Sequence, residues 1–341
     1  MINKLIFSLL IGVVFTSCVA QNKSTENTKL AEKPLYRDTV YDGAADPVVI
    51  WNKGEKRWFM FYTNRRANIE TANGVDWVHG TPIGIAQSTD GGATWQYRGD
   101  ANIQYGEADY TYWAPDVIED KGRYHMYLTV VPGTFTDWKH PRDIVHLTSD
   151  NLIDWKEESV LKLASDKVID AGVFKGKDDW WYMYYNNERD RKSIYVAKSK
   201  DLYQWEDMGK AVGDQAGEGP KVFYWQERYF MIVDHWDGLG VYSSTDLKEW
   251  QRQEENILRN PGKGADDGTK GLHPDVVVQG DKAYIFYFTH PGRTPENDGG
   301  AGSANDSYEV RRSTIQVAEL EFINGQIVCD RDKPVYINLN E

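Results

Sequence analysis

The sequence predicts an all-β fold, a five-bladed β-propeller with four antiparallel strands per blade. No long stretch has the 3.6-residue period of a helix, whereas short alternating or apolar runs bounded by Gly, Asp and Asn recur along the 341 residues. A turn motif with Ser or Thr, Asp and a closing Trp also recurs, and its copies are 60, 50 and 45 residues apart, the length of one blade. The closing residues are Trp95, Trp155, Trp205 and Trp250.

Each repeat divides into four expected strands, and five repeats use nearly all of residues 41–330. The longest insertions, 65–81, 132–142 and 291–311, each join the second and third strands of a blade, so we expect them on one face. Blade by blade, the expected strands are 46–51, 57–64, 82–88 and 94–99; 115–120, 123–131, 143–149 and 154–159; 170–176, 180–187, 193–199 and 204–209; 218–225, 228–234, 239–244 and 249–253; 273–279, 282–290, 313–320 and 325–330.

The segment before the propeller has the pattern of an export signal. Residues 1–17 contain a lysine, an apolar run too short to span a bilayer, and small residues before Cys18. Cys18 resembles a bacterial lipoprotein cleavage site, although an ordinary signal peptide that contains a cysteine would look similar. We expect residues 18–38 to be a flexible tether, residues 39–341 to form the propeller, and the protein to reside in the periplasm or outer membrane of a Gram-negative bacterium.

Charge and cysteine content exclude several classes. The formal net charge of −13 disfavours nucleic acids and anionic membranes, so contact with a membrane is expected only through a lipid anchor at Cys18. If Cys18 is lipidated, Cys329 has no disulfide partner. No phosphate-binding loop, zinc-ligand cluster or Ser–His–Asp motif stands out.

Polar residues open the innermost strand of each blade. Because innermost strands line the central channel of a propeller, these side chains are expected to converge. Each alone is explained by turn capping, but carboxylates recurring once per blade indicate an active site. Two carboxylates suffice to hydrolyse a glycosidic bond, one as acid and one as base, and a third raises the pKa of the acid. The residues are Asp46, Pro115–Asp116, Asp170, Glu218 and His273.

Five short motifs, one per blade and in order, resemble glycoside hydrolase family 43. They are ADPVV, YWAPDV, VIDAGVF, GEGPKVF and LHPDVV. The resemblance implies that Asp46 is the general base, Asp170 the pKa modulator and Glu218 the general acid of an inverting enzyme with its carboxyl groups about 6.5–9.5 Å apart. It also allows a Ca²⁺ ion in the channel near His273, although the chemistry requires no cofactor. Ala171 and Pro274 depart from the family pattern and leave the sugar open.

Sugar sites combine aromatic platforms with fixed polar groups. Arginine forks also bind carboxylate or sulfate, so an acidic or sulfated sugar is conceivable, although either arginine can equally pair with a surface acid. The tryptophans can equally be packing residues, and a histidine within an aromatic strand, such as His125, is more typical of a core. The residues expected to contact substrate are Arg65, Arg66, Trp77, His79, Trp113, Asp116, Trp236 and His273.

The expected function is an exo-acting inverting glycosidase on a plant or algal polysaccharide or its oligosaccharides, with an α-L-arabinofuranoside or β-D-xyloside as the default. An anhydrogalactosidase of the related family 117, or another glycosidase for modified algal sugars, is the main alternative. A sialidase would need six blades and an arginine triad, and invertase-type enzymes would need NDPN and EC motifs that are absent. A surface glycan-binding lipoprotein would be expected to lack one of the three carboxylates.

Overall fold

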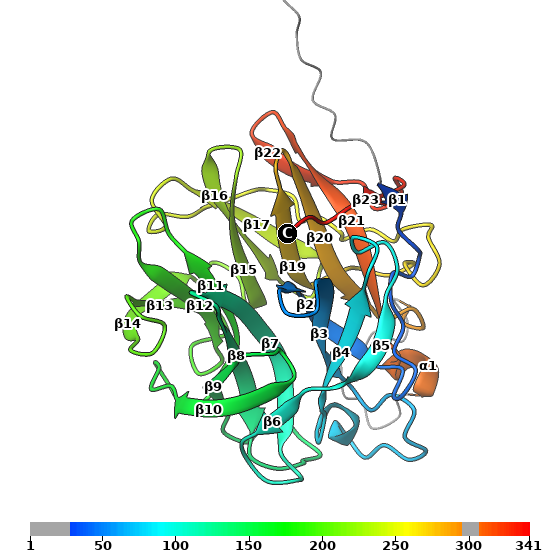
Figure 1. The fold of residues 1–341 in the computed structure, drawn as a ribbon, viewed down its shortest axis with the longest axis vertical. Coiled ribbons are helices and arrows are strands. Elements are labelled where there is room, and N and C mark those ends of the chain that lie inside the picture. Colours follow the sequence, from blue (N-terminus) through cyan, green and yellow to red (C-terminus); the bar gives the residue numbers. More distant parts are fainter. Residues whose placement is uncertain (1–27, 295–306) are drawn as a thin grey trace, which may run out of the picture.

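Five sheets of four or five mainly antiparallel strands are arranged around the central axis of the propeller in the computed structural model, which describes residues 28–294 and 307–341 (Figure 1). This arrangement confirms the predicted five-bladed propeller. The expected signal peptide and Cys18 lie outside the described residues. Within the described ranges, no helix is long and apolar enough to cross a bilayer.

Blades one and two show the expected strand order, in which consecutive strands are neighbours. Blade two has a fifth strand, β6 (Asn102–Gln104), which comes from the connection after blade one and pairs in parallel with the outermost strand of blade two. This added strand was not expected. The remaining strands are β2 (Ala44–Asn52), β3 (Arg57–Asn64), β4 (Ile83–Ser88) and β5 (Gln96–Asp100), then β7 (Thr111–Asp120), β8 (Arg123–Val131), β9 (Asp143–Ser149) and β10 (Asp154–Val160).

Blades three to five each contain four strands in sequence order. The outermost strand of blade four is the shortest, with only two residues. The strands are β11 (Val168–Lys175), β12 (Trp181–Asn187), β13 (Ser193–Ser199) and β14 (Glu206–Val212); β15 (Glu218–Trp225), β16 (Arg228–Asp234), β17 (Leu239–Ser244) and β18 (Gln251–Arg252); β19 (Leu272–Gln279), β20 (Lys282–Thr289), β21 (Thr314–Ile323) and β22 (Gln326–Cys329).

The segment before Asp46 is part of the propeller from Lys29 onwards. Strand β1 (Lys29–Leu30) pairs with β23 (Tyr336–Ile337) near the C-terminus. Leu35 and Tyr36 are buried in the core between blades one and five, and the Tyr36 hydroxyl lies 2.9 Å from that of Tyr62. The described part of the expected tether is therefore ordered, because its apolar side chains pack between two blades.

The recurring Ser-Asp-Trp turn closes the outer strands of four blades. In each copy the serine hydroxyl accepts a backbone N–H at 2.9 Å, which stabilises the tight turn between the third and fourth strands. The motif is therefore structural, as expected. The accepting residues are Ser88, Ser149, Ser199 and Ser244.

The described parts of the three long insertions contact one another. In the first, Val75 donates its N–H to the Thr136 carbonyl of the second at 3.1 Å, and Ile69 accepts a bond of 2.9 Å from Arg311 of the third. Two short helices lie in these insertions: the 3₁₀ helix η1 (Asp76–Val78) and α1 (Tyr308–Arg311). The first insertion also reaches the end where the innermost strands begin, since Arg65 pairs there with Asp46.

Candidate active site

Every innermost strand carries a two-residue bulge at the channel mouth. The register of each first strand against its second shifts at this point, and the first bulged residue has a left-handed backbone. Such bulges bend the strand and re-aim its side chains, and left-handed non-glycine residues are concentrated at functional sites. The equivalent residues are Asp46 (φ 52°), Ala114 (φ 42°), Asp170 (φ 59°), Gly219 (φ 57°) and His273 (φ 33°).

This equivalence refines the expected alignment of the blades. In blade four the bulge begins at Gly219, so Glu218 lies one residue earlier than Asp46 and Asp170 do in their strands. A Cβ at position 219 would come within 2.8 Å of the His273 ring, so glycine is needed there for close packing of the two blades. Glu218, the general acid expected from the resemblance, therefore stands one position before the point in its strand that Asp46, Asp170 and His273 occupy in theirs.

Three predicted residues, His273, Asp46 and Asp170, lie close together. His273 Nδ1 lies 3.5 Å from Asp46 Oδ1 and 3.8 Å from Asp170 Oδ2, although the three residues belong to blades five, one and three. Asp46 and Asp170 are only 5% and 6% exposed. The structure therefore brings together the carboxylates that the blade spacing placed at the channel mouth.

Asp46 is held in its ionised form. Arg65, on the insertion after β3, places Nη2 3.1 and 3.3 Å from the two Asp46 carboxylate oxygens. Burial alone would raise the pKa of Asp46, but the charge of Arg65 and the nearby His273 ring outweigh burial and lower the pKa below its usual value. An ionised carboxylate is what a general base requires.

Asp170 experiences the opposite environment. Burial, followed by the charges of Glu218 and Asp46, raises its pKa well above the usual value. The backbone N–H of Gly219 donates to Asp170 Oδ2 at 3.2 Å and fixes the carboxyl group beside the start of β15. The site therefore contains carboxyl groups of both kinds, one kept ionised and one that favours the protonated form.

Glu218 is partly exposed and faces a tryptophan. The Trp236 indole N–H donates to Glu218 Oε1 at 3.0 Å, and the ammonium group of Lys192 lies 4.4 Å from the centre of the Trp236 ring. The indole occupies one carboxyl oxygen and leaves the other free to meet a substrate. Of the predicted tryptophans, Trp236 is thus the one that contacts a predicted catalytic side chain.

Asp234 is a site residue that sequence reasoning missed. It ends β16 directly opposite Glu218 and is 1% exposed. Burial, followed by the charge of Glu218, raises the pKa of Asp234 to about 8. An alignment of the second strands of the blades would have revealed it, because Asp234 is a carboxylate at the position where blades one and two have Thr63 and Thr129.

Asp116 lies one layer below this group rather than at the mouth. Its carboxylate accepts the Val173 N–H at 2.7 Å and the Lys221 ammonium at 2.8 Å, and Lys221 is also 2.8 Å from Asp275. The expectation that Asp116 contacts substrate is therefore corrected, because it is 4% exposed and its oxygens are occupied.

The surroundings of His273 do not fit directly bound Ca²⁺. Among residues 28–294 and 307–341, no group of three or more His, Cys, Asp or Glu side chains is placed to hold a metal ion. The two carboxylates in the layer below already share the ammonium of Lys221. Since Ca²⁺ takes six to eight oxygen ligands, we derive no step through it.

Three residues expected to contact the sugar are packed within the first insertion and do not face the carboxylates. Arg66 donates to the backbone carbonyls of His79 and Asp76 and so holds the first insertion together. Trp77 and His79 are fully buried, and burial lowers the pKa of His79 to about 4. None of the three reaches the carboxylates, because the insertion folds onto itself.

An aromatic cluster forms the wall beside blade two. Trp113 donates its indole N–H to the Val78 carbonyl at 2.6 Å and is 9% exposed, so little of its ring remains for substrate. Trp138, whose ring centre lies 5.9 Å from that of Trp113, is 39% exposed. Of the two rings, Trp138 therefore has the larger exposed surface for a sugar.

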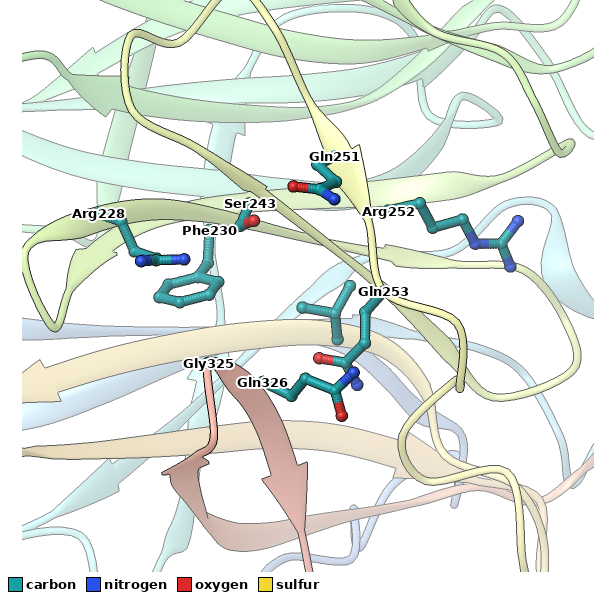
Figure 2. A pocket seen from close by; sticks show the side chains of 9 residues that line it. Arg228, Phe230, Ser243, Gln251, Arg252, Gln253, Gly325 and Gln326 are labelled. Carbon is teal, nitrogen blue, oxygen red and sulfur yellow. The ribbon is translucent and has the colours of Figure 1, made fainter.

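A separate cavity does not belong to this site. It has a volume of about 150 Å³ and lies between blades four and five, where Figure 2 shows Arg228, Phe230 and Gln253 around it. None of the carboxylates described above lines it.

Comparison with solved structures shows which proteins share this fold. In fold, the chain is similar to a thermostable family-43 glycoside hydrolase (TM-score 0.64, 19% identity, 88% of this chain and 97% of that one). It is also similar to the GH43_1 enzyme from Xanthomonas citri complexed with xylotriose (TM-score 0.61, 14% identity, 88% and 93%).

Curated relatives match over a shorter region. A probable sucrose-6-phosphate hydrolase of Vibrio cholerae is 28% identical over 155 residues, which cover 39% of this chain and 28% of that protein. A fructan beta-fructosidase of Streptococcus mutans is 26% identical over 163 residues, 41% of this chain and 11% of that protein. The match thus spans little more than a quarter of the first relative and about a tenth of the second.

A family model related to glycoside hydrolase family 43 and described as "Probable glycosyl hydrolase domain" matches residues 22–264, well over half of the chain. The motif resemblance is therefore confirmed at the level of the family. The chain belongs to this family of probable glycosyl hydrolase domains related to family 43.

Proposed function

We propose that the protein is an exo-acting, inverting glycosidase in which Glu218 is the general acid, Asp46 the general base and Asp170 the residue that tunes the acid. The observation that carries the proposal is the contrast between the carboxyl groups. Asp46 is kept ionised beside Arg65, whereas burial, followed by the charges of Glu218 and Asp46, raises the pKa of Asp170 well above its usual value. A base and an acid in one site are the two groups that glycoside hydrolysis needs.

The roles follow from where each proton goes. Glu218 donates its proton to the glycosidic oxygen as the bond to the anomeric carbon breaks, while Trp236 holds its other oxygen. Asp46 accepts a proton from a water molecule, which attacks the anomeric carbon from the opposite side. The products are an alcohol and a sugar of inverted configuration, and exchange with solvent returns the proton to Glu218 and removes it from Asp46.

The proposed sugar is a pentose, as an α-L-arabinofuranoside or β-D-xyloside at the end of a plant or algal glycan. Support comes from similar folds, whose titles include xylotriose and a β-xylosidase/α-arabinofuranosidase. Exo action is supported by the insertions, since long loops gathered on one face close one end of a site. Trp138, Trp236 and Arg65 are the proposed sugar contacts.

A fructofuranoside is the second candidate. The curated relatives with detectable sequence identity are named as sucrose-6-phosphate hydrolases and a fructan beta-fructosidase. Their matching segments cover about two fifths of this chain. Fructofuranose and arabinofuranose share a five-membered sugar ring.

Hydrolysis of a glycan panel tests the proposal. Wild-type protein, Glu218→Gln and Asp46→Asn are incubated with aryl pentosides, arabinan, xylan, sucrose, fructan, and agar, carrageenan and ulvan oligosaccharides. We expect wild type to release a single monosaccharide whose first anomer in ¹H NMR is inverted. Glu218→Gln should bind but not cleave, because its amide keeps the shape and cannot donate the proton. Binding of every glycan without turnover by wild type would contradict the proposal.

We further propose that the protein is exported and anchored through a lipid on Cys18. The support is the sequence alone, with an apolar run and small residues before this cysteine. Expressed in a Gram-negative host, wild type should partition into the detergent phase and Cys18→Ala into the aqueous phase. Equal partitioning of both would contradict the anchor.

A further inference from the structure

We propose that Asp234 positions the general acid and shares a proton with it, a role that rests on the glycosidase function proposed above. Asp234 and Glu218 are cross-strand partners on β16 and β15, so their side chains leave the sheet on the same face, about 5 Å apart at Cβ. No motif of the resemblance includes Asp234. Its contacts join the walls of the site contributed by blades four and five.

Two backbone donors converge on the Asp234 carboxylate. Oδ1 accepts the Trp236 N–H at 2.7 Å and Oδ2 accepts the His273 N–H at 2.9 Å. Both donating residues have left-handed backbones, with φ 56° at Trp236 and 33° at His273, which non-glycine residues adopt only when their surroundings hold them. Asp234 is thus part of what holds them.

Trp236 and His273 each contact side chains with proposed catalytic roles. Trp236 donates its indole N–H to Glu218 at 3.0 Å, and the His273 ring lies between Asp46 and Asp170. Because their backbones are fixed by the same carboxylate, a shift of Asp234 would move both sides of the site together. Asp234 therefore positions the acid through its neighbours and does not itself need to contact substrate.

Comparison of the blades shows that anchoring a bulge does not require a charge. The Thr63 hydroxyl accepts the Ala114 N–H at 2.8 Å, and the Thr129 hydroxyl accepts the Asp170 N–H at 2.9 Å. These are the same interblade contact that Asp234 makes to His273. The carboxylate of Asp234 therefore adds a charge beside Glu218 that the structural role alone does not explain.

The groups that face Asp234 make this charge consequential. Glu218 faces it from β15, Asp46 from β2 and His273 from β19. A buried and a partly exposed carboxyl group side by side cannot both ionise readily, so their protons leave in two steps that belong to the pair. The pair retains one proton towards neutral pH, and partly exposed Glu218 is the member that can deliver it.

The pH dependence of hydrolysis separates this role from simple anchoring. We compare wild type with Asp234→Asn and Asp234→Thr, the latter reproducing the residue that other blades use at this position. Both variants lose the shared charge, so the basic limb of the kcat/KM profile should move about 1–2 pH units lower. At a fixed pH above that limb, kcat should fall by about tenfold or more with little change in KM. An unchanged basic limb in Asp234→Thr would overturn the proposal.

A second measurement does not depend on activity. Trp236 contacts Glu218, so its fluorescence, taken as the difference between wild type and Trp236→Phe, should report loss of the shared proton near pH 8. The midpoint should fall by more than one pH unit when Asp234→Thr is introduced. If this shift occurs while no glycan is cleaved, proton sharing stands and the glycosidase proposal fails. If glycans are cleaved and neither the fluorescence midpoint nor the basic limb of the kcat/KM profile moves, the glycosidase proposal stands and proton sharing fails.

Discussion

Replacing Lys221 by methionine should destabilise the propeller by removing the cation between two channel carboxylates. The Lys221 ammonium is 2.8 Å from both Asp116 and Asp275, which come from blades two and five. Methionine has similar length and no charge, so the variant leaves two acids facing each other across the channel. Both acids keep one backbone donor, from Val173 and Val49.

The size of the loss follows from the burial of the three side chains. Removing one partner of a buried ion pair costs about 3–5 kcal/mol, because the remaining charge is left without compensation. The Lys221 side chain is 16% exposed, and those of Asp116 and Asp275 are 5% and 3% exposed, so water compensates only slightly. We expect a loss of about 3 kcal/mol and a fall in Tm of about 6 °C.

Chemical and thermal denaturation measure this effect. Lys282→Met is the matched control, since Lys282 forms a 3.0 Å pair with Glu319 and is 43% exposed, and it should cost less than about 1 kcal/mol. EDTA should leave the Tm of wild type unchanged. Millimolar Ca²⁺ should restore part of the stability of Lys221→Met, because the freed carboxylates are ligands that Ca²⁺ prefers. Equal losses in the two lysine variants, or an EDTA-sensitive wild type, would refute the reasoning.

Two further predictions concern the catalytic groups. Arg65→Met should move the acidic limb of the kcat/KM profile to higher pH, because Arg65 lowers the pKa of Asp46 and its loss lets burial raise that pKa. Arg66→Met, which disturbs only backbone contacts of the insertion, is the control and should leave that limb in place. Trp236→Phe should lower kcat by about tenfold by removing the indole donor to Glu218, a contact of about 1.5 kcal/mol; pre-steady-state rates equal to wild type would contradict this.

The propeller was predictable because its signals are local. Strand alternation and the Ser-Asp-Trp turn are written within a few residues, and their spacing sets the blade count. The convergence of Asp46, Asp170 and Glu218 followed from symmetry, since one polar residue opens each innermost strand. The ordered segment from Lys29 was missed because its pairing partner, β23, lies about 300 residues away in the chain.

The expected substrate contacts show where such reasoning stops. Arg66, Trp77 and His79 stand in a long insertion, where composition suggests binding and cannot reveal that the insertion folds onto itself. Asp116 was placed at the mouth because the depth of a residue in the channel depends on a bulge that the sequence does not mark.

By itself the sequence determined the all-β class and the number of blades, and it predicted that Asp46, Asp170 and Glu218 lie near one another, since these depend on periodicity and on order along the chain. Only the tertiary structure decided that Arg65 keeps Asp46 ionised, that Lys221 neutralises the channel below, and that Asp234 stands beside Glu218. Charge interactions change steeply with distances of a few ångströms, and those distances are set by how one blade packs against the next.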